Sequence, residues 1–177
     1  MIIGAIDLGT NTFDLLLAQV TDGNLKILYR EKQWVGLGTG LYPSMELQQD
    51  ALHRATQCLI HFNGIAKEYQ ANVLRACGTS ALRDAINGRL WCAEIHEKTG
   101  ISIEVISGIQ EAKRVFSGIK NLSNIPSDGI IMDIGGGSTE LIVFRELQLD
   151  HVFSLDIGVT RLLNALDFNN PLTEEEI

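Results

Sequence analysis

Apolar residues with two different spacings divide this chain into predicted strands and helices. Short apolar runs separated by turn-forming residues predict three consecutive strands at residues 2–6, 13–20 and 25–31. Farther along, apolar side chains recur every three or four positions, which is the spacing of one helix face. Helices are therefore expected at residues 44–69, 81–98 and 108–120, and strands at residues 73–77 and 101–106. The second helix is expected to be interrupted near Asn87 and Gly88. Ser44 is expected to cap the first helix, and Gly100 is expected to end the second.

After a polar, turn-rich stretch at residues 124–129, the pattern begins again. Residues 129–144 predict a hairpin, residues 149–157 a further strand, and the stretch from Gly158 to about residue 166 a helix. Strands that alternate with helices predict an α/β fold, with a mixed sheet and helices on its faces. We interpret residues 1–127 as one complete α/β domain and residues 128–177 as the beginning of a second.

Both predicted hairpins place an acid immediately before a glycine turn. The pattern D-[LI]-G-[TG] occurs at residues 7–10 and again at residues 133–136. Because glycine has no Cβ atom, such a turn allows backbone N–H groups to converge on an anion. Carboxylates beside an anion suit a phosphate group with Mg²⁺ between them. Each turn alone is also compatible with a tight hairpin that carries a chance acid.

The paired turns resemble the two phosphate loops of the actin, sugar-kinase and heat-shock ATPase superfamily. The longer strings DLGTNTF and MDIGGGSTEL resemble the exopolyphosphatase and guanosine pentaphosphate phosphohydrolase family. GTSALRDAIN at 78–87 and ISGIQEAKRVFSGI at 106–119 agree with the same family and follow its order. The resemblance implies a ribonuclease H-like, actin-type ATPase fold. It also implies hydrolysis of a terminal phosphate from inorganic polyphosphate or guanosine pentaphosphate, which are the expected substrates.

The resemblance and the twin turns together assign the candidate site residues. Glu111 matches the second of two acids that the family carries before an alanine, so it is the expected catalytic base. Asp7, Asp133 and Glu140 are expected to hold Mg²⁺, the expected cofactor. The residues expected to bind substrate phosphate are Thr10, Asn11, Thr12, Arg83, Gly135, Gly136, Gly137, Ser138 and Thr139. Asp14 stands where the family often has His and is assigned no role, and Asp84 is expected at the surface.

The composition of the chain limits the kinds of partner that it is expected to bind. The chain has 177 residues and a formal net charge of −8, without a run of Lys or Arg, so we expect no nucleic-acid partner. Cys58, Cys77 and Cys92 lack metal-site spacing and are expected to be free thiols. No apolar run approaches the roughly 20 residues of a membrane helix, and the N-terminus does not read as a secretory signal. We therefore expect a cytoplasmic protein without a membrane partner.

Two other functions fit the same loops. One is a kinase or ATPase of the same superfamily, and the other is a regulatory scaffold that binds phosphate without turnover. Glu111 separates the scaffold from a hydrolase, because a hydrolase needs a group that orients water and a pure binder does not. A second sheet with an uncovered apolar face also predicts self-association, for example as a homodimer.

Overall fold

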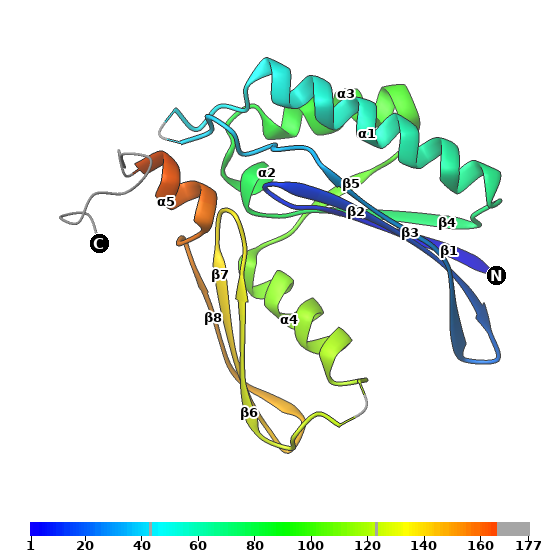
Figure 1. Ribbon diagram of the computed structural model, residues 1–177, viewed down its shortest axis with the longest axis vertical. Coiled ribbons are helices and arrows are strands. Elements are labelled where there is room, and N and C mark those ends of the chain that lie inside the picture. Colours follow the sequence, from blue (N-terminus) through cyan, green and yellow to red (C-terminus); the bar gives the residue numbers. More distant parts are fainter. Residues whose placement is uncertain (43, 123, 166–177) are drawn as a thin grey trace.

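The computed structural model describes residues 1–42, 44–122 and 124–165 and shows two β-sheets with helices packed on them (Figure 1). The first sheet has the strand order β3-β2-β1-β4-β5. Its strands are β1 (Ile2–Leu8), β2 (Thr12–Thr21), β3 (Asn24–Trp34), β4 (Val73–Gly78) and β5 (Ile103–Val105). Strands β1 to β3 are antiparallel neighbours, and β4 and β5 extend the sheet in parallel from β1.

Helices α1 (Gln49–Glu68) and α3 (Gly88–Thr99) cover one face of this sheet, and the short helix α2 (Ser80–Asp84) follows β4 (Figure 1). Alternate residues of the strands point into the core under these helices, as a period of two requires. Leu8, Phe13 and Leu15 are fully buried there, and they share one hydrophobic cluster with Leu59 and Phe62 of α1. The N-terminal strands thus form a rigid base for the turn between β1 and β2.

The second sheet has the order β6-β7-β8, with β6 (Gly129–Ile134), β7 (Thr139–Arg145) and β8 (Gln148–Leu155). Helix α4 (Gly108–Ile119) packs on one face of this sheet, and α5 (Val159–Ala165) follows β8. Ala112 and Phe116 of α4 share a buried cluster with Ile142 and Phe144 of β7. The second hydrophobic core therefore begins with α4, whereas the sequence predicts the domain boundary at residue 127. The apolar stripe of α4 fits the second sheet, and this packing decides where the helix belongs.

Most predicted elements are present, with one clear difference at the start of the first helix. The helix expected from Ser44 begins at Gln49, because the Ser44 hydroxyl donates to the Leu41 carbonyl (3.1 Å) and stabilises a turn instead of a helix end. The helix expected over residues 81–98 is divided into α2 and α3, in agreement with the interruption expected near Asn87 and Gly88. Gly100 ends α3 in the left-handed conformation, as expected. The predicted end of the last helix, at residue 166, lies outside the described residues.

The face of the second sheet opposite α4 is apolar and exposed. Ile130, Met132 and Ile134 of β6 are 70%, 60% and 62% exposed, respectively, and Phe153 and Leu155 of β8 also reach solvent. Contiguous exposed apolar side chains on a sheet favour association. Among the described residues, no helix is long and apolar enough to cross a membrane.

We expect this exposed face to drive self-association of the chain. The Met132→Lys variant should lower the apparent mass measured by light scattering, because a charge at the centre of the face opposes its burial. Ile27→Lys is the matched control, since Ile27 is 59% exposed on β3 of the first sheet. A wild-type chain that is a monodisperse monomer contradicts the prediction.

Candidate active site

The two hairpins β1–β2 and β6–β7 repeat one another in register. Asp7 lies opposite Asp14 across the first hairpin, and Asp133 lies opposite Glu140 across the second. In the first turn the Gly9 N–H donates to the Thr12 carbonyl at 3.0 Å, and in the second the N–H at residue 135 donates to the carbonyl at residue 138 at 2.9 Å. Each hairpin therefore carries two facing acids at the base of the same four-residue turn.

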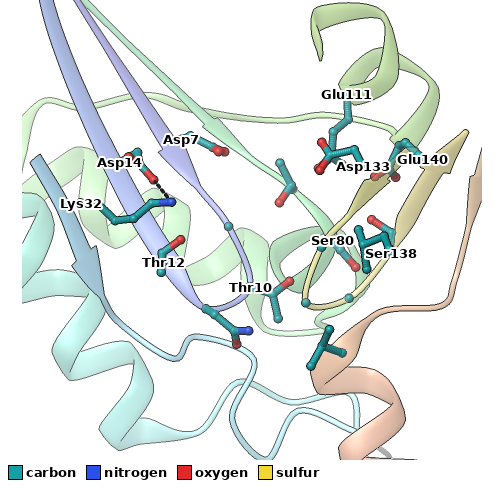
Figure 2. A pocket seen from close by; sticks show the side chains of 18 of the residues that line it. Asp7, Thr10, Thr12, Asp14, Lys32, Ser80, Glu111, Asp133, Ser138 and Glu140 are labelled. Carbon is teal, nitrogen blue, oxygen red and sulfur yellow. Dashed lines mark ion pairs between the residues drawn. The ribbon is translucent and has the colours of Figure 1, made fainter. Parts of the chain in front are cut away.

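The tips of the two turns meet at one pocket of about 440 Å³ (Figure 2). A Cβ atom on Gly136 would lie only 2.8 Å from the Cβ of Thr10, so the second turn approaches the first as closely as glycine permits. The pocket is lined by most of the predicted site residues: Asp7, Thr10, Asn11, Thr12, Glu111, Asp133, Gly135, Gly136, Gly137, Ser138 and Glu140. Segments far apart in the sequence thus supply one concave, polar surface.

Five carboxylates line this pocket: Asp7, Asp14, Glu111, Asp133 and Glu140. Among the described residues, Lys32 is the one cationic side chain that lines it, and its Nζ lies 3.2 Å from a carboxylate oxygen of Asp14. The pKa of Asp7 is raised to about 6, because the pocket walls reduce its hydration and because Asp14 and Asp133 repel its charge. Water still reaches the Asp7 side chain. The pocket therefore has a surplus of negative charge.

Glu111 occupies the first turn of α4 and points into the pocket (Figure 2). Ser107 and Gln110 form a capping box that fixes the start of this helix. The pKa of Glu111 is raised to about 7, first by burial and then by repulsion from Glu140, against the opposing attraction of Arg83. A carboxyl group that titrates near neutral pH can take up a proton during a reaction.

Two predicted phosphate-binding residues do not line the pocket. Arg83 pairs with Glu111 at 3.3 Å and donates to the Ile106 carbonyl at 3.0 Å, so its placement suits holding Glu111 rather than phosphate. Thr139 donates its hydroxyl to the Ile157 carbonyl at 2.6 Å. Successive side chains of a strand point to opposite faces, so β7 cannot direct Thr139 into the pocket together with its neighbours.

Sequence reasoning missed Asp14, Lys32, Thr79 and Ser80, all of which line the pocket. The internal repeat contained the signal for Asp14, because this residue stands at the same distance from Asp7 as Glu140 stands from Asp133. Lys32 is placed by strand pairing, since it lies opposite Asp14 in the β2–β3 ladder. Helix α2 follows β4 and thereby brings Thr79 and Ser80 to the same edge of the sheet.

The donor set suits a hard divalent cation. Carboxylate oxygens and phosphate oxygens are the ligands that Mg²⁺ takes, usually with several waters. Among the described residues, no group of three His, Cys, Asp or Glu side chains lies close enough to hold a metal ion alone. An ion in this pocket would therefore complete its coordination with substrate oxygens and water, and the surplus of carboxylates fits that arrangement.

The raised pKa of Glu111 predicts a pH-dependent gain in stability for the Glu111→Gln variant. Burial disfavours the ionised carboxylate in the folded state. The wild-type chain therefore loses stability as the pH rises from 4.5, the ordinary pKa of a Glu side chain, to about 7, the pKa of Glu111 in the folded protein. The variant should melt a few degrees higher than wild type at pH 8 and at nearly the same temperature at pH 4.5. Glu94→Gln is the control, since Glu94 is half exposed on α3. An equal difference in melting temperature at both pH values would contradict the cause assigned here.

The first sheet, with its order β3-β2-β1-β4-β5, and the repeated hairpin of the second define an α/β protein of the actin type. The profile of the Ppx/GppA phosphatase family matches residues 16–177. This protein belongs to the Ppx/GppA phosphatase family.

Solved structures agree with this assignment. The chain is 34% identical to an exopolyphosphatase from Cytophaga hutchinsonii, with a TM-score of 0.94 over 99% of this chain and 56% of that one. It is 28% identical to a Ppx/GppA family member from Aquifex aeolicus, with a TM-score of 0.81 over 99% of this chain and 57% of that one. The fold is shared with the ethanolamine utilization protein EutJ from Carboxydothermus hydrogenoformans. That protein is 18% identical, with a TM-score of 0.55 over 92% of this chain and 54% of that one. The chain thus spans little more than half the length of these relatives, and the predicted actin-type fold is confirmed.

Proposed function

We propose that this protein hydrolyses the terminal phosphate of inorganic polyphosphate or guanosine pentaphosphate, with Mg²⁺ as cofactor. The observation that carries the proposal is that Glu111 and both glycine turns line one pocket. Membership of a phosphatase family supports the reaction class. Similarity to a protein described as an exopolyphosphatase supports the substrate class.

The orientation of the turn peptides supports phosphate binding between the two turns. The Thr10 carbonyl accepts a hydrogen bond from the Gly38 N–H (2.8 Å), and the Gly136 carbonyl accepts one from the Thr160 N–H (2.8 Å). In a planar trans peptide the C=O and N–H groups point in opposite directions. These carbonyls point toward the loop after β3 and toward α5, so the N–H groups of the next residues, Asn11 and Gly137, are directed toward the pocket. Converging N–H groups of this kind bind anions.

Glu111 has the position and the pKa for orienting water. A water molecule beside its carboxylate would attack the terminal phosphorus, and the P–O bond to the next phosphate would break. The proton of the water would pass to Glu111, and the leaving phosphate would keep the electron pair of the broken bond. Phosphoryl transfer demands mainly positioning and charge neutralisation from the protein. Arg83 supports this role, because its guanidinium fixes the direction of the Glu111 carboxylate.

Mg²⁺ would supply the positive charge that this pocket needs for a polyanionic substrate. Asp7, Asp133 and Glu140 are the residues that would hold it, directly or through water. Glu140 is 1% exposed and accepts a hydrogen bond from the Ser154 hydroxyl at 2.8 Å, so its carboxylate is fixed in place. Asp7 is exposed and Asp133 is partly exposed, so water can reach both acids from the pocket.

Phosphate release tests the proposed function in the complete protein. Polyphosphate, guanosine pentaphosphate and ATP should be compared at equal phosphate concentration, with and without Mg²⁺. We expect Mg²⁺-dependent release from one of the first two and at least tenfold slower release from ATP. Faster turnover of ATP would favour the kinase or ATPase alternative. Binding of all three without release would favour the regulatory scaffold.

A further inference from the structure

We propose that Arg161 is a positioning residue that locks the peptide between Gly137 and Ser138, so that the Ser138 N–H faces the phosphate site. Arg161 lies on α5, behind the second glycine turn. The proposal rests on the proposed function, because it assumes that the pocket between the turns binds phosphate. It assigns a role to a residue that neither the sequence patterns nor the pocket lining identify.

Arg161 contacts the turn and the first half of the chain at the same time. Its Nε donates to the Gly137 carbonyl at 2.8 Å, and its Nη2 pairs with a carboxylate oxygen of Asp84 at 2.6 Å. The guanidinium also lies over the ring of Tyr42, with its Cζ 4.4 Å from the ring centroid. The side chain is 19% exposed. The Nε, the Nη2 and the face of the guanidinium therefore each have a partner.

Asp84 is a fixed anchor for this arginine. Its side chain is only 14% exposed, although the sequence suggested a surface position. One of its carboxylate oxygens accepts hydrogen bonds from the Tyr42 hydroxyl at 2.8 Å and the Ser80 hydroxyl at 3.1 Å, in addition to the pair with Arg161. Burial and the bond to Asp84 raise the pKa of Tyr42 to about 12, so the hydroxyl keeps its proton.

The turn needs such a lock because three consecutive glycines restrict the backbone so little. Rotation of the peptide between Gly137 and Ser138 changes ψ of Gly137, where no Cβ atom opposes it, and φ of Ser138, where the Cβ atom imposes a modest cost. In the flipped state the Gly137 carbonyl would face the phosphate and repel it. The bond from the Arg161 Nε holds this carbonyl on the α5 side, which directs the Ser138 N–H to the opposite side. The N–H of residue 161 adds a bond to the Gly136 carbonyl at 3.1 Å.

The fit of α5 against the turn supports this reading. A Cβ atom on Gly158 would lie 2.5 Å from the Gly136 carbonyl carbon and oxygen, so glycine is required where α5 approaches the turn. The Thr160 hydroxyl donates to the side-chain oxygen of Asn11 at 2.8 Å and so links α5 to the first turn as well. Helix α5 thus contacts both phosphate turns, and Arg161 is its most extensively bonded side chain.

The test compares Arg161→Gln, Arg161→Lys and Asp84→Asn in the complete protein. The measured quantity is the affinity for inorganic tripolyphosphate with Mg²⁺, determined by calorimetry. In Arg161→Gln the phosphate should lose its hydrogen bond from the Ser138 N–H. The loss of one hydrogen bond to a charged group should weaken tripolyphosphate binding about tenfold. Arg161→Lys should be nearly as weak, because one ammonium cannot bridge Gly137 and Asp84. Arg145→Gln is the matched control, since Arg145 pairs with Asp150 on the second sheet, outside the pocket.

Two further readouts separate positioning from simple stabilisation. The double variant Arg161→Gln/Asp84→Asn should bind tripolyphosphate no more weakly than whichever single variant has the lower affinity. Both changes release the same peptide, the one between Gly137 and Ser138. In the free protein, Arg161→Gln should accelerate hydrogen exchange at the turn of residues 135–138 by at least tenfold more than at β1. Wild-type affinity in Arg161→Gln or Arg161→Lys would overturn the proposal. Affinity losses that merely follow melting temperature would overturn it as well.

Failure of the proposed function would give a different result. A wild-type protein that binds tripolyphosphate without releasing phosphate refutes hydrolysis and leaves the affinity test of Arg161 intact. A wild-type protein that binds no tripolyphosphate refutes the phosphate site, and with it the positioning role toward phosphate. The hydrogen-exchange comparison then still decides whether Arg161 fixes the turn.

Discussion

Replacing Glu111 with Gln is expected to reduce phosphate release from polyphosphate by about 10²–10⁴-fold, the usual effect of removing a general base. The side chain is 18% exposed at the pocket wall, and its pKa of about 7 suits a group that accepts a proton from water. Gln keeps the shape but cannot accept that proton. Binding of tripolyphosphate should change less than threefold, since in the proposed site the turns and not Glu111 would hold the phosphate.

The matched control for this variant is Glu104→Gln. Glu104 lies on β5, pairs with Arg114 of α4 and is 59% exposed, outside the pocket. Its phosphate release should remain at the wild-type rate. If Glu111→Gln retains turnover within a few-fold of wild type, Glu111 is only an acid at a helix N-terminus, where the helix dipole favours it in any case.

Replacing Asp133 with Asn should raise the Mg²⁺ concentration needed for half-maximal turnover by about 10- to 100-fold, the range seen when a group that orients or holds a metal is removed. Asp133 is the next-to-last residue of β6, beside the second turn, and faces the same pocket as Asp7 (Figure 2). Its charge raises the pKa of Asp7. The pKa of Asp7 should therefore be lower in the variant than in wild type, which nuclear magnetic resonance can measure.

Asp150→Asn is the control for the metal prediction, because it removes one charge from β8 at a site paired with Arg145. This control should leave the Mg²⁺ dependence unchanged. An Asp133→Asn variant that loses melting temperature and activity in parallel, with an unchanged Mg²⁺ dependence, would show a structural role for Asp133.

Local features of the sequence were sufficient to predict the strands, the helices and the two glycine turns. The β1–β2 and β6–β7 hairpins follow from short apolar runs on each side of a glycine turn, which tertiary packing did not change. The meeting of Asp7, Glu111 and Asp133 in one pocket also agrees with the prediction, because strand ends and turns of related units face a common edge. Their roles in binding and catalysis stay predictions.

Other features depend on contacts that no local pattern contains. Helix α4 has an apolar stripe that could cover either sheet, and its packing with Ile142 and Phe144 of β7 places it on the second. Asp84 looked like a surface acid because its partners, Tyr42 and Arg161, lie far away in the sequence. Thr139 was assigned to the pocket from its neighbours, although strand alternation alone would have excluded it.

The most direct test of the phosphate site is a crystal structure of the complete Glu111→Gln protein with Mg²⁺ and tripolyphosphate. The terminal phosphate should lie between the turn at residues 9–12 and the turn at residues 135–138. It should accept a hydrogen bond from the Ser138 N–H, with a water molecule held beside residue 111. A phosphate chain bound instead in the neighbouring groove, beside Arg89, with no phosphate between the two turns, would contradict the account.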